Sequence, residues 1–167
     1  MGAEHRLWVD NQTHTLHLDG QTFRCDRDIE TALPWRQYAL LLSSDTDCLS
    51  LWDEDGLVRL TRVGVYPQDM ALRDDTAVVC GGADGKLHLL TLPDLHEAAA
   101  YPLPGMPERV CIHQGAAYVL TLLTEPEVHT MLLTLPPDGS QWTELERFAG
   151  IPDGLCVVNG AIQVALL

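Results

Sequence analysis

A strand-turn-strand unit recurs from end to end of this 167-residue chain, and it constrains the fold more than any other feature. Each copy has an apolar strand, a tight turn, a second apolar strand and then Asp-Gly or a similar break. Three copies open on nearly the same pattern of a proline, polar residues and an apolar run, at residues 67–72, 107–112 and 152–157. A looser copy, with one extra residue, opens at Pro34. Stacked β units of this kind predict an all-β fold built by repetition.

The repeat sets the expected domain organisation. Equivalent positions fall at Leu7, Ala39, Ala71, Cys111 and Cys156, and Asn-Gly, Asp-Gly and Gln-Gly pairs between the strand runs supply the positive φ angles that hairpin turns need. Only residues 93–100 carry a helix signal, and their position suits a loop or the start of a fourth strand. We therefore expect a single domain over residues 1–167, made of about four to five short antiparallel units.

Composition limits the classes of partner. An apolar content of 46% and a charged content of 20% are ordinary for a globular protein, and the net charge of −14 repels nucleic acid and anionic membranes. No apolar stretch approaches the roughly 18 residues of a membrane helix, and no signal peptide is indicated, so we expect a cytoplasmic protein. The five cysteines lack paired spacing, which favours reduced thiols, and Cys80, Cys111 and Cys156 lie in apolar strand runs typical of buried positions.

Short antiparallel meanders that recur at 32 to 45 residues are typical of β-propeller blades. Residues 82–90 resemble the inner hairpin of quinoprotein-like and related bacterial β-propellers, and residues 104–110 resemble the link from an outer strand to the next inner strand. Leu51-Trp52-Asp53 resembles the tryptophan-aspartate dipeptide of another propeller class, whose partner Gly-His pair is absent. The resemblance implies a propeller architecture and no particular family.

Ring closure is the open question, because the fifth unit contains only its first two strands. Propellers usually close when one end of the chain completes the blade begun by the other end, which here gives a small ring of four or five blades. Alternatively, two chains each give half of a larger ring. Since an open array leaves a β edge and an apolar flank exposed, we expect a homodimer. A barrel-like closure of the same meanders is the structural alternative.

Signals for catalysis or metal binding are weak. The chain has no Gly-rich phosphate loop, no Gly-x-Ser-x-Gly elbow and no His-Glu-x-x-His. His14 and His17 are three residues apart on an expected strand, so they face opposite sides and cannot share a metal. The run Asp53-Glu54-Asp55-Gly56 holds only fragments of a calcium loop, and hairpin turns favour Asp-Gly for conformational reasons. We expect no metal and no cofactor.

The remaining candidate site depends on position. In a propeller, the loops that enter the innermost strands gather on one face around the central channel. Here those loops contain an aromatic residue, two arginines, a glutamine and several carboxylates: Trp35, Arg36, Gln68, Asp69, Glu108, Arg109 and Asp153. Together they could bind a small polar ligand or the loop of a protein partner. The structural alternative is that Trp35 packs between blades and the charges are ordinary surface.

Three functional hypotheses follow. The first is a soluble binding or interaction module that presents the propeller face to a protein or to a small polar ligand. The second is a propeller-based lyase or hydrolase at the channel mouth, in which His113, Glu108 and Asp153 carry the chemistry. The third is a sensor or structural component that contacts only itself and one protein partner.

Overall fold

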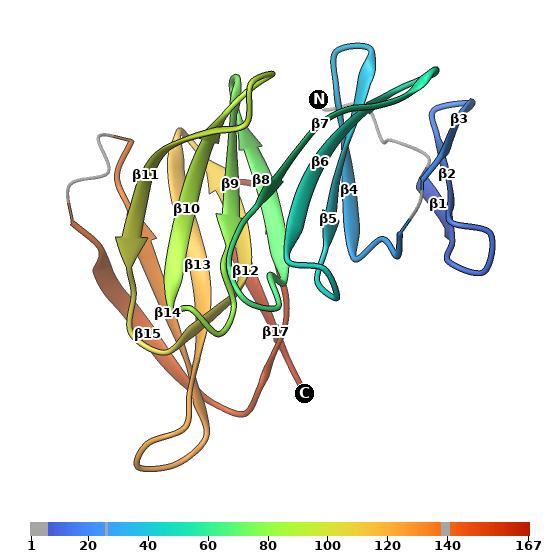
Figure 1. The fold of residues 1–167 in the computed structure, drawn as a ribbon. Coiled ribbons are helices and arrows are strands. Elements are labelled where there is room, and N and C mark those ends of the chain that lie inside the picture. Colours follow the sequence, from blue (N-terminus) through green and yellow to red (C-terminus); the bar gives the residue numbers. More distant parts are fainter. Residues whose placement is uncertain (1–6, 26, 138–140) are drawn as a thin grey trace.

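The computed structural model describes residues 7–25, 27–137 and 141–167. These residues form seventeen β-strands and no helix, and the strands make five antiparallel sheets (Figure 1). The expected all-β class is therefore confirmed. In the same ranges, no helix is long and apolar enough to cross a membrane.

The sheets follow chain order. The first sheet is β1 (Leu7–Asp10), β2 (Thr15–Leu18) and β3 (Gln21–Arg24). The second is β4 (Thr31–Trp35), β5 (Tyr38–Ser43), β6 (Cys48–Asp53) and β7 (Gly56–Arg62). The third is β8 (Asp69–Arg73), β9 (Thr76–Cys80), β10 (Lys86–Thr91) and β11 (His96–Pro102). The fourth is β12 (Met106–His113), β13 (Ala116–Leu123), β14 (His129–Leu135) and β15 (Thr143–Ala149). The last sheet is β16 (Pro152–Val158) and β17 (Ala161–Leu166).

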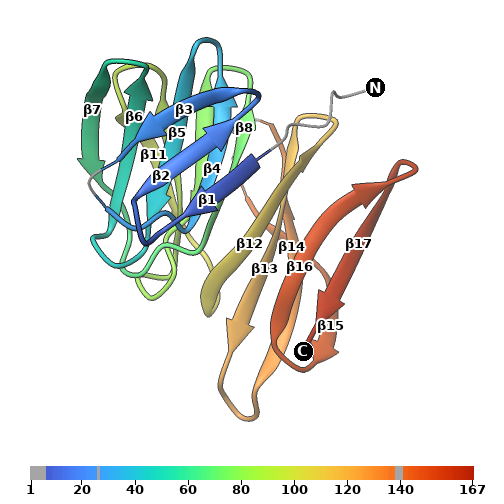
Figure 2. The ribbon, with the colours of Figure 1, turned by 90° about the vertical axis from the view of Figure 1, so that its right-hand side faces the viewer.

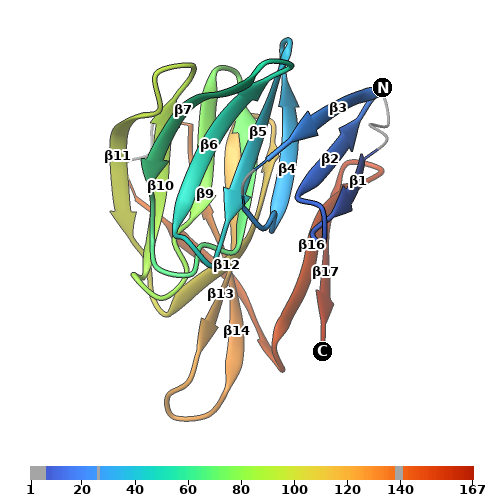
Figure 3. The ribbon, with the colours of Figure 1, turned by 45° about the vertical axis from the view of Figure 1, so that its right-hand side comes forward.

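The first strands of successive sheets lie together along the inner edge of the array. Strand β8 contacts both β4 and β12, and β12 contacts β16. From this edge each complete sheet runs outward strand by strand, and the second and third sheets stack as neighbours (Figure 3). Short meanders stacked about a shared inner edge are the arrangement of propeller blades.

The first sheet corresponds to the second, third and fourth strands of a blade. Its β1–β2 turn matches the β5–β6 turn, because each ends on a non-glycine residue with positive φ just before the next strand, His14 at 51° and Asp47 at 53°. Strand β3 also leads directly to the inner strand β4, as β7 leads to β8. Among the described residues, the first sheet therefore has no inner strand, and the last sheet has no third or fourth strand.

This correspondence places the repeat positions on two kinds of strand. Leu7 and Ala39 lie in second strands, β1 and β5, whereas Ala71, Cys111 and Cys156 lie in first strands. The equivalent of Ala39 is Ala77, since both begin the buried part of a second strand that pairs with the inner strand before it. Residues 93–100 carry a helix signal, but they form a turn and most of the fourth strand β11, as expected from their position.

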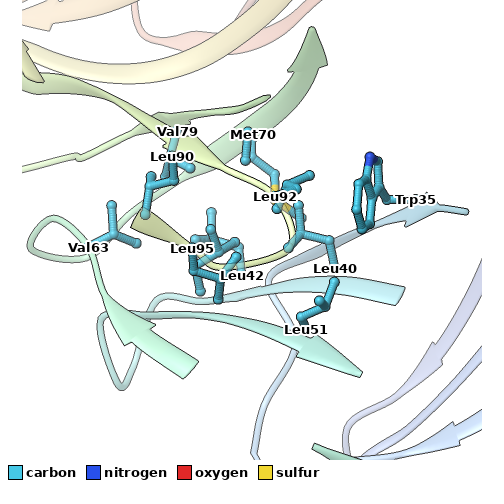
Figure 4. Close-up of a cluster of buried hydrophobic side chains, with 12 residues drawn as sticks. Trp35, Leu40, Leu42, Leu51, Val63, Met70, Val79, Leu90, Leu92 and Leu95 are labelled. Atoms are coloured by element: carbon cyan, nitrogen blue, oxygen red, sulfur yellow. The ribbon is translucent and has the colours of Figure 1, made fainter. Parts of the chain in front are cut away.

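Apolar clusters between neighbouring sheets hold the stack together. The cluster between the second and third sheets includes Leu40, Leu42, Val79 and Leu90 (Figure 4). Similar clusters join the first sheet to the second and the third sheet to the fourth. Central strands such as β5 are covered on both faces, which explains their continuous apolar sequence. Each fully buried leucine contributes about 1.5–3 kcal/mol through removal from water.

The cysteines differ in exposure. Cys48 and Cys80 are buried, Cys111 is partly buried and Cys156 is exposed, and none of these four forms a disulfide. Burial raises the pKa of the Cys80 thiol well above its ordinary value, and it raises that of Cys111 to about 11. The expectation of reduced thiols agrees with this arrangement. The expectation that Cys156 is buried is wrong, because no further described sheet covers the outer face of β16–β17.

Candidate functional site

One polar position recurs where the chain enters each inner strand. The backbone N–H of Glu30 donates to the carbonyl of Leu42 at 2.8 Å, and the N–H of Gln68 donates to the equivalent carbonyl of Cys80 at 3.1 Å. In β12 and β16 the register shifts after the proline, so that Glu108 and Asp153 are the extra residues of β-bulges. We call Glu30, Gln68, Glu108 and Asp153 the mouth residues.

The local sequence explains why the mouth residues are held in place. Each follows a buried residue that anchors the start of an inner strand, in order Ile29, Pro67, Pro107 and Pro152. The mouth residues themselves are partly buried or exposed. A buried anchor followed by a polar residue therefore repeats four times along the inner edge, and it sets three carboxylates and one carboxamide at the same end of the inner strands.

Asp69 joins the third sheet to the fourth beside the mouth residues. Its Oδ1 accepts a hydrogen bond from the N–H of Met70 at 2.9 Å, and its Oδ2 accepts one from the N–H of Val110 in β12 at 3.1 Å. Burial raises the pKa of Asp69 from 3.8 to about 6, although the two backbone hydrogen bonds and Arg109 oppose the shift. The carboxylate thus satisfies a backbone donor on the neighbouring inner strand at an electrostatic cost.

Arg109 makes the matching link from the fourth sheet to the last. Its Nε donates to the carbonyl of Asp153 at 3.0 Å, and its Nη1 donates to the carbonyl of Glu108 at 2.7 Å. Burial raises the pKa of the Glu108 carboxyl, while the nearby guanidinium of Arg109 lowers it. Five of the residues predicted from sequence therefore lie together at the inner mouth: Gln68, Asp69, Glu108, Arg109 and Asp153.

The other two predicted residues lie at the opposite end of the inner strands. Trp35 ends β4, and its Nε1 donates to Asp75 Oδ1 at 3.1 Å. Arg36 Nη2 donates to Asp75 Oδ2 at 3.2 Å, and its guanidinium carbon lies 4.6 Å from the centroid of the Trp35 ring. Tyr38 stacks on the same ring. Because Pro34 lies within β4 and not before it, Glu30 takes the place at the mouth that the sequence pattern assigned to Trp35.

The residues of the enzymatic hypothesis are likewise divided. His113 ends β12 and lies near Tyr118, with ring centroids 6.3 Å apart. Glu108 lies near the start of the same strand, and Asp153 lies near the start of β16. Since a strand rises about 3.3 Å per residue, the five residues from Glu108 to His113 separate the imidazole from the carboxylates of the mouth.

A second polar cluster was not predicted from the sequence. His88 in β10 is only 7% exposed, and its two ring nitrogens contact two carboxylates: Nε2 lies 2.6 Å from Asp84 Oδ2, and Nδ1 contacts Glu97 Oε1. A Cβ on Gly81 would collide with the ends of the Asp84 and His88 side chains, so a larger residue there would displace both groups. Within the described ranges, no group of three or more His, Cys, Asp or Glu residues is arranged to hold a metal ion.

The acidic turn at residues 53–56 has a conformational explanation. Asp53 Oδ1 accepts hydrogen bonds from the N–H groups of Asp55 at 2.8 Å and of Gly56 at 3.1 Å. These bonds close the turn between β6 and β7, and Gly56 has a φ of 133°. The carboxylate of Asp53 is thus used to stabilise the hairpin.

Titration of Asp69 gives a testable consequence. Because its pKa is raised from 3.8 to about 6, the folded state favours the protonated carboxyl, and ionisation costs stability. Stability contributed by this group is complete below its ordinary pKa and is lost as the pH rises through about 6. Relative to Asp69→Asn, the wild-type free energy of unfolding should fall by about 1–3 kcal/mol between about pH 4 and about pH 7. Urea denaturation of both proteins across this range checks the slope, and parallel curves would contradict the shift.

The chain resembles known proteins in its fold and not in its sequence. No protein-family model matches the chain, and no curated protein matches it in sequence. Among solved structures, the dihydro-heme d1 dehydrogenase NirN in complex with DHE superposes with a TM-score of 0.74 at 15% identity, covering 96% of this chain and 39% of that one. The computationally designed proteins Ika8 and Ika4 superpose with TM-scores of 0.63 and 0.60, each at 11% identity, and 96% and 85% of this chain are covered.

These likenesses establish the architecture alone, since all three identities are far below the range in which function transfers. The chain spans about two fifths of the length of NirN, 57% of Ika8 and 92% of Ika4. The blade-like antiparallel sheets match these structures over most of the chain, so the fold is an all-β array of propeller-like blades.

Proposed function

We propose that this protein is a binding module whose inner mouth holds a polar ligand, or the loop of a protein partner, that carries at least one cationic group. The observation that supports this proposal is the repetition of a carboxylate or carboxamide at one position at the start of four successive inner strands, the mouth residues. The mouth residues lie at or next to the start of a strand, which fixes their backbone, so binding costs little backbone conformational entropy.

Arg109 restricts the ligand further. Its guanidinium is anchored by two backbone carbonyls, and it brings positive charge next to Glu108 and Asp69. The mouth therefore offers both acceptors and a donor within a short span. A ligand with a cationic group and a nearby hydrogen-bond acceptor suits it better than a simple polycation. The geometry gives less support to a lyase or hydrolase, because His113 is far along β12 from Glu108.

The test uses arginine amide as a probe, since it combines a guanidinium and an amine with a carbonyl acceptor. We expect it to bind with a dissociation constant in the millimolar range or tighter at about 0.15 M salt, where exposed charges are largely screened. Glu108→Gln should weaken binding by at least about threefold, which is about 0.7 kcal/mol for one charge-assisted contact. Isothermal titration calorimetry measures both constants.

Glu127→Gln is the matched control, because Glu127 is an exposed glutamate in the β13–β14 loop and its loss changes the net charge by the same amount. This variant should bind the probe as the wild type does. If no binding is detected, or if the two variants weaken it equally, the site proposal is overturned, since the protein's general negative charge then accounts for the attraction.

A further inference from the structure

The last sheet has one face against the fourth sheet and one face open. Strand β16 contacts β12 and β13, and alternate side chains such as Leu155 and Val157 are partly buried on that side. The opposite side is exposed, and Val158 there is 46% accessible. We call this side the last-sheet face; its residues are Cys156, Val158, Ala161, Gln163 and Ala165.

In the complete blades, the equivalent face is covered. Cys156 corresponds to Ala71 and Ala165 to Cys80, by their positions in the first two strands of the sheet. Ala71 packs against the apolar cluster that joins the third sheet to the fourth, and Cys80 is fully buried in that cluster. The last-sheet face therefore continues a stacking surface that is already used elsewhere in the molecule.

The first sheet has a complementary open face. Its inner side packs Leu16 and Phe23 onto the second sheet. On its outer side, Trp8 is 60% exposed and stacks on His17 with ring centroids 4.7 Å apart, and Thr22 Oγ1 lies 3.1 Å from His17 Nδ1. The register pairs Trp8 with His17 and His17 with Thr22, so these three form one row across the sheet, which we call the first-sheet face.

We propose that the last-sheet face of one copy docks against the first-sheet face of a second copy, and that the reciprocal contact closes a two-chain ring. Small residues on the last-sheet face, Ala161 and Ala165 among them, leave room for the large Trp8 ring. The first and last sheets lie apart, on either side of β12 in Figure 2, and no strand of the first sheet pairs with a strand of the last among the described residues. A contact between unlike faces forms a closed dimer when it occurs twice about a twofold axis.

Solution mass and one charge substitution test the interface. Light scattering should give about twice the chain mass of 18.4 kDa for the wild type and a mass near 18.4 kDa for Val158→Glu. Val128→Glu is the matched control, because Val128 is 51% exposed in the β13–β14 loop, away from both faces. It should remain dimeric. A wild-type monomer at every concentration, or a ladder of larger species, would overturn the two-chain ring.

Mixing two defective copies tests whether the contact joins unlike faces. Each contact in the ring joins one first-sheet face to one last-sheet face. Trp8→Ser alone or Val158→Glu alone therefore weakens both contacts in a ring of identical copies, and each variant should be monomeric. An equal mixture contains one pairing in which both faces are intact, namely the last-sheet face of Trp8→Ser with the first-sheet face of Val158→Glu. Sedimentation should therefore show a dimer only in the mixture. Dimerisation of Trp8→Ser alone would instead indicate pairing of two last-sheet faces, or of a strand along the free edge of β17, and would contradict the proposal.

Discussion

Gly82→Ala is expected to lower the free energy of unfolding by at least about 3 kcal/mol. Gly82 has a φ of +66°, and a Cβ there would lie 2.6 Å from the carbonyl oxygen of Val65 and closer still to that of Tyr66. Both obstacles are backbone atoms in the link from β7 to β8, so they cannot move without separating the second and third sheets. Urea denaturation followed by tryptophan fluorescence measures the loss.

Gly160→Ala isolates the steric part of this effect. Gly160 has a similar φ of +76°, but a Cβ there meets no atom within 4 Å in the described structure. Its loss should be limited to the strain of a left-handed alanine, about 1 kcal/mol. Equal losses for the two variants would mean that the close approach of the β7–β8 link to Gly82 does not exist in solution.

Leu49→Ala should cost about 2–5 kcal/mol, the usual range for deleting a buried leucine side chain. Leu49 is 0% exposed and lies in the cluster between the second and third sheets. The cost combines the lost transfer energy with the cavity left behind, and the stiff strands on either side limit collapse. Chemical denaturation of the purified variant gives the value.

Leu57→Ala is the control for sheet stacking. Leu57 is 45% exposed on the outer strand β7. Its truncation should cost less than about 1 kcal/mol. If Leu57→Ala lowered the free energy of unfolding as much as Leu49→Ala, the Leu57 side chain would have to be buried, which would contradict its exposed place on β7.

The architecture could be predicted from the sequence because its signals are local. Continuous apolar runs mark the central strands, alternating apolar residues mark half-buried ones, and turns at Asp-Gly, Asn-Gly and Gln-Gly mark where the hairpins reverse. The repeat of these signals predicts stacked meanders, and the complete sheets have that form. The mouth position could also be predicted in the three copies that begin with Pro67, Pro107 and Pro152, because in each a proline directly precedes the polar residue.

The second sheet shows why the remaining mouth residue was missed. Its anchor is Ile29 and not a proline, and the sequence instead offers Pro34, which lies near the end of the edge strand β4, where the missing N–H is tolerated. The pattern therefore pointed to Trp35 and Arg36, one strand length away. Ala39 and Ala77 each begin the buried apolar run of a second strand, so they are equivalent positions. Counting back from them along the paired inner strands makes Glu30 the equivalent of Gln68.

The carboxylate–imidazole cluster depends on cross-strand register, which no local pattern contains. Glu97 reaches His88 because a β-bulge shifts the pairing of β10 and β11 between Leu89 and Leu90. Asp84 reaches the other ring nitrogen only because Gly81 leaves space beside it. Exposure of Cys156 was missed for a related reason, since its apolar neighbours are typical of a covered strand.

Binding of arginine amide to two further variants tests whether the mouth residues form the site. The sequence pattern expects Arg36 among the loops at the inner mouth, whereas the structure puts Glu30 there and Arg36 at the opposite end of β4. We expect Glu30→Gln to weaken binding by at least about threefold and Arg36→Gln to leave it unchanged. The opposite result, with Arg36→Gln changing the affinity and Glu30→Gln leaving it unaltered, would contradict both the placement of the inner strands and the proposed site.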